Sequence, residues 1–183
     1  RMLFQLKNFP IDSLIKAAAE DFLIVAQEKG LKFAIGSIEE VDVQADFDKA
    51  YELLGNLFNN SLKFTQKGSI TIYTKKEGEL VKVFVEDSGI GIDKEDQKKI
   101  FDKFRQIIHQ ELGKPQGSGL GLYIGLLLAQ EMGGSLWLER SEPGSGSTFA
   151  FSLPVSGSNS AQKTQEKLKK EANLHPDQKS LIV

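Results

Sequence analysis

Apolar residues along the chain recur at two different intervals, which separate predicted helices from predicted strands. Intervals of three and four residues over 12–29 and over about 47–65 predict two amphipathic helices. A third predicted helix, from about 119 to 132, is apolar on most sides, and a short one begins at Lys94. These segments make up the helical part of the expected fold.

Strict alternation of apolar and polar residues predicts six short strands, at 31–35, 41–45, 69–74, 80–85, 135–139 and 147–153. The first two are expected to flank a turn at Gly36-Ser37, and the other four to form two hairpins. Helices and antiparallel strands are mixed without the repeating βαβ order of a parallel sheet. The predicted fold class is therefore α+β, with helices covering one face of a sheet.

The composition changes after Val155. From Ser156 onward the chain is rich in Ser, Gly, Lys, Glu and Gln, which is typical of a solvated linker in which a helical turn or two could form. We therefore expect one folded domain over 11–155, followed by a flexible polar tail over 156–183. The last residues, 179–183, fit either a tail or the first strand of a following domain, such as a receiver.

Composition and charge exclude several classes of function. A formal net charge of −2 lacks the basic excess of a general nucleic-acid surface. The absence of cysteine excludes disulfides, thiolate metal sites and a cysteine nucleophile. No apolar run approaches the roughly 20 residues of a membrane-spanning helix. Because the chain opens on Arg1-Met2 without a signal peptide, we expect it to be a piece of a longer protein.

A stripe of polar residues runs along the predicted helix at 47–65. Glu52, Asn56, Asn60 and Lys63 recur at intervals that place them on one face. Neutral amide oxygens suit Mg²⁺, a hard cation that also binds substrate phosphates, and the lysine supplies a positive charge for those phosphates. Taken alone, such a stripe is more often just the solvated face of an amphipathic helix.

Asp87 stands where a predicted strand gives way to the glycine-rich turn 88–92. A carboxylate there can accept a hydrogen bond from an exocyclic amine such as adenine N6, and Gly89 and Gly91 let the backbone approach a flat ring. The same residues also fit an Asx-type turn in which Asp87 caps the local backbone. The motif alone leaves both interpretations open.

Three alternating glycines, Gly117, Gly119 and Gly121, run directly into the third predicted helix. Their amide groups lie at its N-terminus, where the helix dipole favours anions, so phosphate binding is the natural use. A dinucleotide-binding fold would need a preceding strand and a glycine in place of Leu122, whereas Lys114-Pro115-Gln116 precedes the glycines here. A Walker A sequence is also absent from the chain.

In this order, the motifs resemble the catalytic, ATP-binding domain of sensor histidine kinases, within the group that includes gyrase-type and chaperone-type ATPases. The resemblance spans about Ile11 to Pro154 and covers the N box (Asn56, Asn60, Lys63, Phe64, Thr65), the G1 box (Asp87, Gly89, Gly91), the F box (100–104) and the G2 box (Gly117, Gly119, Gly121). It implies a two-layer α/β sandwich of the Bergerat type. In that fold a mixed, mostly antiparallel sheet of about five strands is backed by three helices, and a mobile lid covers ATP.

The resemblance also implies that the chain binds ATP and Mg²⁺, with roles assigned by position. Asn60 would hold Mg²⁺, Asn56 would lie beside the reacting γ-phosphate, and Lys63 would contact phosphates. Asp87 would bind adenine N6, with Thr148 supporting the same site through water. The complete ATP site implied is Asn56, Asn60, Lys63, Phe64, Asp87, Gly89, Gly91, Ile92, Phe101, Phe104, Gly117, Ser118, Gly119, Leu120, Gly121, Leu122 and Thr148.

One position departs from the family pattern in the expected lid, residues 105–117. Many members carry an arginine two residues after the second F-box phenylalanine, where this chain has Gln106, with Arg105 one residue earlier. Glutamine at that place resembles the hybrid kinases, which carry a receiver domain after the catalytic one. Arg105 and Gln106 are both retained as candidate contacts to the γ-phosphate.

Neither histidine of the chain, His109 or His175, stands in the sequence context of a phosphoacceptor. The resemblance therefore implies that the γ-phosphoryl group passes to a histidine on a separate helical dimerisation domain of the same protein, with residues 1–10 as the exit from that domain. A response regulator or receiver domain would be the next partner. The parent is expected to be a cytoplasmic homodimer, with or without a membrane anchor elsewhere, and this domain to contact neither nucleic acid nor membrane directly.

Two other functions remain as alternatives. An ATP-hydrolysing clamp of the gyrase or chaperone type would carry a glutamate in place of Asn56 to activate water, and an amide is a poor general base. A nucleotide-binding regulatory module without catalysis is opposed by the intact Asn60, Asp87 and glycines. The sequence therefore favours phosphoryl transfer over both.

Overall fold

The computed structural model describes residues 3–106 and 118–174, and its central element is a five-stranded sheet. The strands lie in the order β2-β4-β5-β7-β6, and every neighbouring pair is antiparallel except β2 with β4. The strand bounds are Lys32–Ile35 (β2), Ser69–Glu77 (β4), Leu80–Asp87 (β5), Leu136–Glu142 (β6) and Gly146–Pro154 (β7). The expected mixed, mostly antiparallel sheet is confirmed.

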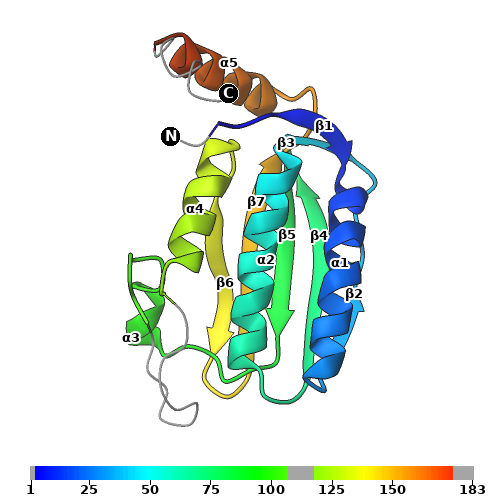
Figure 1. The fold of residues 1–183 in the computed structure, drawn as a ribbon, viewed down its shortest axis with the longest axis vertical. Helices are drawn as coiled ribbons and strands as arrows, with labels where there is room; N and C mark the ends of the chain where they lie inside the picture. Colours follow the sequence, from blue (N-terminus) through cyan, green and yellow to red (C-terminus); the bar gives the residue numbers. More distant parts are fainter. Residues whose placement is uncertain (1–2, 107–117, 175–183) are drawn as a thin grey trace, which may run out of the picture.

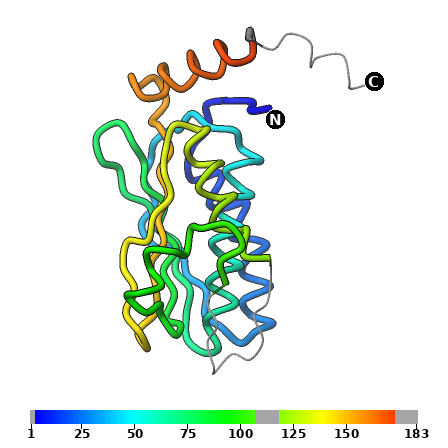
Figure 2. Tube along the Cα trace, turned by 90° about the vertical axis from the view of Figure 1, so that its left-hand side faces the viewer, coloured from blue at the N-terminus to red at the C-terminus, as the bar shows by residue number. Residues whose placement is uncertain are grey.

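Three helices cover one face of this sheet: α1 (Ile11–Glu28), α2 (Phe47–Phe64) and α4 (Gly121–Glu131) (Figure 1). A fourth, short helix, α3 (Lys94–Gln97), lies beside the lower part of the sheet. The view turned by 90° shows the helices in one layer and the strands in the other (Figure 2). The α+β class and the two-layer sandwich backed by three helices are therefore confirmed.

The central helix α2 owes its position to a continuous apolar face. It buries seven residues against the sheet and the neighbouring helices: Ala50, Leu53, Leu54, Leu57, Phe58, Ser61 and Leu62. The ring of Phe58 stacks on that of Phe22 in α1 with centroids 3.9 Å apart. Burying each large apolar side chain is worth about 1.5–3 kcal/mol, so α2 is anchored along its length and its opposite face is free to carry polar residues.

The strands expected around Gly36-Ser37 do form, but they do not pair with each other. Strand β2 joins the main sheet parallel to β4, whereas β3 (Asp42–Ala45) pairs antiparallel with β1 (Lys7–Pro10) in a separate two-stranded sheet. Alternation of side chains identifies a strand but not its partner. Residues 7–10, predicted as part of the exit from an upstream dimerisation domain, form strand β1, and their role as an exit stays a prediction.

The tail contains more structure than the turn or two that its polar composition suggested. Residues Asn159–Leu174 form a helix, α5, which lies across the end of the molecule near β1 (Figure 1). Glu79, in the turn between β4 and β5, accepts hydrogen bonds from Ser160 N at 3.1 Å and Ser160 Oγ at 2.7 Å. Within α5, Ala161 and Thr164 are buried. The stabilising partner is 81 residues away in sequence, which local composition cannot reveal.

Within the described residues, none of the helices has the length and apolar character needed to cross a membrane.

Candidate functional site

A cavity of about 380 Å³ opens between the C-terminal half of α2, the segment after β5 and the N-terminus of α4. Polar and glycine residues form most of its wall, and five apolar side chains complete it. The lining residues are Asn56, Asn59, Asn60, Lys63, Phe64, Ile92, Ile100, Arg105, Gln106, Ser118, Gly119, Gly121, Leu122 and Phe149. The structure therefore brings together most of the polar stripe, the start of the third predicted helix and residues flanking the F box.

The amides and the lysine of α2 reach the cavity because its apolar face is turned the other way. Asn56, Asn60 and Lys63 all line the wall, as the spacing predicted. The Asn56 side-chain Nδ2 donates to the backbone oxygen of Gly121 at 3.3 Å, which ties the middle of α2 to the first turn of α4. Three of the four stripe residues thus form a cavity wall, whereas Glu52 is exposed and pairs with Lys49 at 3.1 Å.

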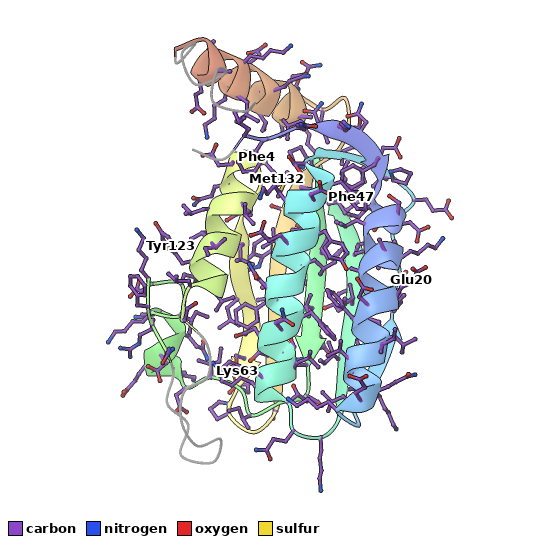
Figure 3. All side chains as sticks on the ribbon, viewed as in Figure 1. Phe4, Glu20, Phe47, Lys63, Tyr123 and Met132 are labelled. Atoms are coloured by element: carbon purple, nitrogen blue, oxygen red, sulfur yellow. The ribbon has the colours of Figure 1, made fainter. Side chains whose placement is uncertain are left out.

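Lys63 is half-buried near the C-terminal end of α2 (Figure 3). Its Nζ lies 5.0 Å from the centroid of the Phe64 ring, within the range of a cation–π contact. Burial lowers the pKa of Lys63 from its ordinary value, because removal from water disfavours the ammonium form. A polyanion in the cavity would favour that charge.

Asp87 ends β5 on the face of the sheet that carries the helices, with 4% of its surface exposed. Its Oδ1 accepts the backbone N–H groups of Gly89 at 2.9 Å and Ser147 at 3.3 Å, and its Oδ2 accepts the hydroxyl of Ser61 at 3.2 Å. Burial raises the pKa of the Asp87 carboxyl, while hydrogen bonds from Gly89, Ser61 and Ser147 and the nearby Thr65 hydroxyl act in the opposite direction. The local Asx-type cap and a buried acceptor are therefore both present in one residue.

Asp87 does not itself line the cavity. It lies on β5 two residues beyond the partner of Phe149, which does line the cavity. Val85 is two residues before Asp87 on β5 and faces Phe149 on β7, which is part of the cavity wall. Side chains two residues apart point to the same face of a sheet, at a separation of about 7 Å. The carboxylate is therefore placed at the margin of the cavity, on its side of the sheet.

Gly89 and Gly91 allow close approach to protein backbone. A Cβ on Gly89 would lie 2.3 Å from the oxygen of Phe64, and one on Gly91 would lie 2.0 Å from the oxygen of Glu142. Gly91 also has a φ of 72°, which favours glycine. The two glycines thus fasten the turn after β5 to the end of α2 and to the β6–β7 turn, whereas the sequence suggested an approach to a flat ring.

The glycine-rich turn leads into α4, whose first residue, Gly121, lies on the cavity wall. Leu120 N donates to Ser118 Oγ at 3.3 Å, and Leu120 O accepts from Ile124 N as the first bond of the helix. The next amides, from Gly121 onward, have no intrahelical acceptor because they belong to the first turn. They form a positive helix terminus at the cavity. Leu120 lies beside the wall without lining it.

The F-box residues divide between the core and the surface. Phe101 packs edge-on against Phe149 with centroids 6.4 Å apart, whereas Phe104 is 71% exposed and has a φ of 59°. Arg105 and Gln106 both line the cavity, and Arg105 Nη2 pairs with Asp96 Oδ1 at 3.0 Å. Phe101 therefore supports the wall through Phe149, while neither phenylalanine of the F box lines the cavity.

The placement of Thr148 beside Asp87 is corrected by the structure. Thr148 pairs with Glu86, and its hydroxyl donates to Glu86 Oε2 at 3.4 Å on the opposite face of the sheet. Ser147 is the residue that faces Asp87. A one-residue difference reverses the face on which a side chain lies, so the sequence motif alone placed the wrong hydroxyl at the site.

Sequence reasoning missed three residues of the wall, Asn59, Ile100 and Phe149, and one buried partner of Asp87, Ser61. Asn59 adjoins the polar stripe and carries a third amide, which was an available signal. Phe149 looks like an ordinary core residue in the sequence, and Ile100 belongs to the F box but is absent from the expected ATP contacts. Several predicted features lie outside the described residues: Gly117, His109, His175, the lid beyond Gln106 and residues 179–183.

Known proteins share this arrangement of sequence and fold. The profile of the family described as histidine kinase-, DNA gyrase B-, and HSP90-like ATPase matches residues 45–157. The aerobic respiration control sensor protein ArcB of Escherichia coli is 36% identical over 159 residues, which cover 84% of this chain and 20% of ArcB. The hybrid signal transduction histidine kinase B of Dictyostelium discoideum is 40% identical over 152 residues, which cover 78% of this chain and 8% of that protein. The chain spans a fifth or less of the length of these curated relatives.

Solved structures give the same picture for the fold. The catalytic domain of the histidine kinase ThkA superposes with a TM-score of 0.70 at 28% identity, covering 82% of this chain and 95% of that one. Full-length ShkA, crystallised in complex with AMPPNP, superposes with a TM-score of 0.73 at 28% identity, covering 84% of this chain and 32% of ShkA. The sheet and the three helices thus belong to an architecture found in histidine kinase catalytic domains.

Proposed function

The chain belongs to the histidine kinase-, DNA gyrase B-, and HSP90-like ATPase family, and from that premise we propose that it binds Mg²⁺·ATP and transfers the γ-phosphoryl group to a histidine of a separate domain. One observation carries the proposal. The amides and lysine of α2 face the N-terminus of α4 across a single cavity, and a buried carboxylate lies at its margin.

The adenine end of the site is assigned to Asp87. Its carboxylate is buried and fixed by three hydrogen bonds, and an ionised carboxylate only accepts. It would accept a hydrogen bond from the 6-amino group of adenine, while Ile92 and Phe149 would contact the ring from the cavity wall. The complex of the similar protein ShkA with AMPPNP supports an adenine nucleotide as the ligand.

The phosphate end is assigned to Asn56, Asn60, Lys63 and the amides of Ser118 to Leu122. A positive helix N-terminus and a lysine suit a triphosphate. The donor set fits Mg²⁺ bound through one amide oxygen, waters and phosphates, since the described residues contain no cluster of three acidic or histidine side chains that could hold a metal alone. Asn60 would hold the ion, which when bound supplies charge neutralisation at the γ-phosphate.

Transfer is favoured over hydrolysis by what the cavity wall lacks. Among the described residues, no Asp, Glu or His side chain lines the cavity. Asn56 occupies the place of the water-activating glutamate of the hydrolases, and its amide is too weak a base to take a proton from water. Phosphoryl transfer needs positioning and charge stabilisation more than a base within this domain. The site therefore suits delivery of the phosphoryl group to an acceptor that supplies its own nucleophile.

The acceptor in this proposal is a histidine on a helical dimerisation domain of the same, longer protein. A response regulator or a receiver domain would take the phosphoryl group next, as the hybrid kinase among the relatives suggests. The described residues contain no histidine. The parent would act as a homodimer in the cytoplasm, and this domain would bind neither nucleic acid nor lipid.

The test is a phosphotransfer assay with γ-labelled ATP and Mg²⁺, with and without the separately expressed upstream region of the parent protein. We expect label on a histidine of the upstream region only when both parts are present, and no stable label on this chain alone. Rapid release of inorganic phosphate by the chain alone would favour the hydrolase. Binding of ATP with neither label nor release would favour a regulatory module.

A further inference from the structure

Two hydroxyl groups from the last turn of α2 lie around Asp87, and neither belongs to the cavity wall. Ser61 and Thr65 both have no exposed surface and are four residues apart, so they lie on the same side of the helix end. Ser61 Oγ donates to Asp87 Oδ2 at 3.2 Å. The hydroxyl groups of both residues are therefore buried inside the protein, beside the proposed adenine acceptor.

The Thr65 hydroxyl lies close to the same carboxylate, beside Gly89. The point that a Cβ on Gly89 would occupy lies 2.8 Å from Thr65 Oγ1 and 2.9 Å from Asp87 Oδ1, so both oxygens crowd one small space. Thr65 Oγ1 nevertheless meets hydrogen-bond geometry with no group in the described part of the chain. A buried hydroxyl without a full partner destabilises the fold, so its position beside Asp87 needs a physical reason.

We propose that Ser61 and Thr65 are positioning residues that hold the Asp87 carboxylate as a fixed acceptor and thereby set the preference of the site for a 6-amino purine. This inference rests on the proposed binding of ATP. It adds two residues that do not contact the phosphates of the nucleotide. Both act on the adenine end of the site through Asp87.

The physical argument follows from the two oxygens of Asp87. Backbone N–H groups of Gly89 and Ser147 occupy Oδ1, and among the described residues the Ser61 hydroxyl alone donates to Oδ2 within hydrogen-bond geometry, which leaves Oδ2 able to accept from one more group. A 6-amino group can donate there, whereas the 6-oxo group of guanine would bring one acceptor against another. Leaving two acceptors unpaired in a buried site is strongly unfavourable, so the site should bind adenine in preference to guanine.

Ser61 is needed because burial alone works against this state. Burial raises the pKa of Asp87, and the Ser61 hydroxyl is among the groups that lower it. A protonated carboxyl would be able to donate to a 6-oxo group. Without Ser61 the carboxyl is also freer to rotate, and the contrast between the two bases decreases.

The test measures binding of ATP, GTP and the purine triphosphate without a 6-amino group, each with Mg²⁺, to the wild type and to Ser61→Ala. We expect Ser61→Ala to weaken ATP binding by about three- to tenfold, the range of one hydrogen bond, and the unsubstituted purine triphosphate by less than about twofold. The ratio of ATP to GTP affinity should decrease. Ser152→Ala is the matched control, because this buried serine accepts from Ser135 N far from the cavity.

Equal weakening of ATP and of the unsubstituted purine triphosphate would overturn the inference, since it would show a general structural effect. An unchanged affinity for both would overturn it as well. In either case ATP binding by the wild type would leave the proposed function standing. If the wild type binds none of the three triphosphates, the proposed function fails and the inference fails with it.

Thr65→Val provides a second variant that is nearly isosteric and removes only the hydroxyl. We expect the nucleotide-free protein to unfold at the same or a higher temperature, because a buried polar atom is lost. ATP affinity should fall by about two- to tenfold, again with little change for the unsubstituted purine triphosphate. A lower unfolding temperature with unchanged ATP affinity would show that the hydroxyl serves the fold alone and would contradict the proposal.

Discussion

The two ends of the sheet differ in how their polar groups are paired. At the nucleotide end, formed by the C-terminal ends of α2 and β5 with the first turn of α4, buried polar groups surround Asp87. At the far end, formed by the β4–β5 turn, Gly133 and α5, polar groups are paired with each other. The buried polar groups of the first end lower the stability of the fold, whereas the paired polar groups of the second end raise it.

The cost at the nucleotide end is visible in its individual groups. Burial disfavours the charged forms of both Asp87 and Lys63, so the pKa of the carboxyl is raised and that of the ammonium is lowered. The Thr65 hydroxyl adds an unfulfilled donor. Phosphates beside Lys63 and an adenine amino group on Asp87 would favour these two charged forms, so the burial that disfavours both charges in the nucleotide-free protein strengthens binding.

The far end shows the opposite balance. Glu79 accepts hydrogen bonds from Ser160 at the start of α5, Thr164 Oγ1 donates to Ser160 O at 2.8 Å, and Lys167 pairs with Glu131 at 3.4 Å. Hydrogen bonds from Ser160 are the main reason that the pKa of Glu79 is lowered. Substitutions here should therefore change stability and leave nucleotide affinity unaltered.

The largest effect is expected from Gly133→Ala at the far end. Gly133 has a φ of 83°, and an added Cβ would lie 2.0 Å from Thr164 Oγ1. Left-handed backbone strain and overpacking should together lower the free energy of unfolding by about 2–3 kcal/mol. Denaturant titration measures this loss, and calorimetry should find ATP affinity unchanged. The added effect of Gly133→Ala in a Thr164→Ala background should be smaller, because the clash is relieved.

The next effect concerns the nucleotide end, where Asn60 is the proposed Mg²⁺ ligand. Asn60→Ala should reduce the affinity for Mg²⁺·ATP by about tenfold, with the free energy of unfolding unchanged, because a half-buried amide at a cavity wall contributes little packing. Binding of ATP in the presence of a chelator is the control and should be equal in the two proteins. An equal loss with and without Mg²⁺ would remove Asn60 from the metal site.

A smaller and more local effect is expected from Glu79→Gln. The neutral side chain accepts more weakly from Ser160, so amide hydrogen exchange should become faster over residues 159–164 and not around Asp87. Because the folded pKa of Glu79 is lowered, the same loosening should develop in the wild type as the pH falls through that pKa. Glu77→Gln, in the same hairpin but paired with Lys82, is the matched control and should leave α5 unchanged.

The smallest effect is expected from Thr148→Val. Its hydroxyl lies on the face of the sheet away from the cavity, so ATP affinity should stay within about twofold of the wild type, less than the worth of one hydrogen bond. A tenfold loss of affinity would return Thr148 to the adenine site.

The sequence predicted the parts of the molecule that depend on local pattern. The apolar face of α2 and the alternation of β4, β5 and β7 gave the layers and the class, and the polar stripe of α2 gave Asn56, Asn60 and Lys63.

Long-range pairing could not be predicted in the same way. The partner of β3 is β1 rather than β2, and the cap of α5 comes from Glu79. At the site, the register of β7 decided between Thr148 and Ser147, and only the folded chain shows that Ser61 faces Asp87. Each of these depends on which strand or helix end lies alongside, which local composition does not contain.

The most direct test of the central claim is thermal unfolding of the wild type and Asp87→Asn at neutral pH, each with and without Mg²⁺·ATP. Because the pKa of Asp87 is raised on folding, its ionised form destabilises the empty protein as the pH rises through that value, and an amide avoids this. We predict that empty Asp87→Asn unfolds at the same or a higher temperature than the wild type and loses the stabilisation by Mg²⁺·ATP. A variant that is less stable when empty yet still fully stabilised by Mg²⁺·ATP would contradict the account.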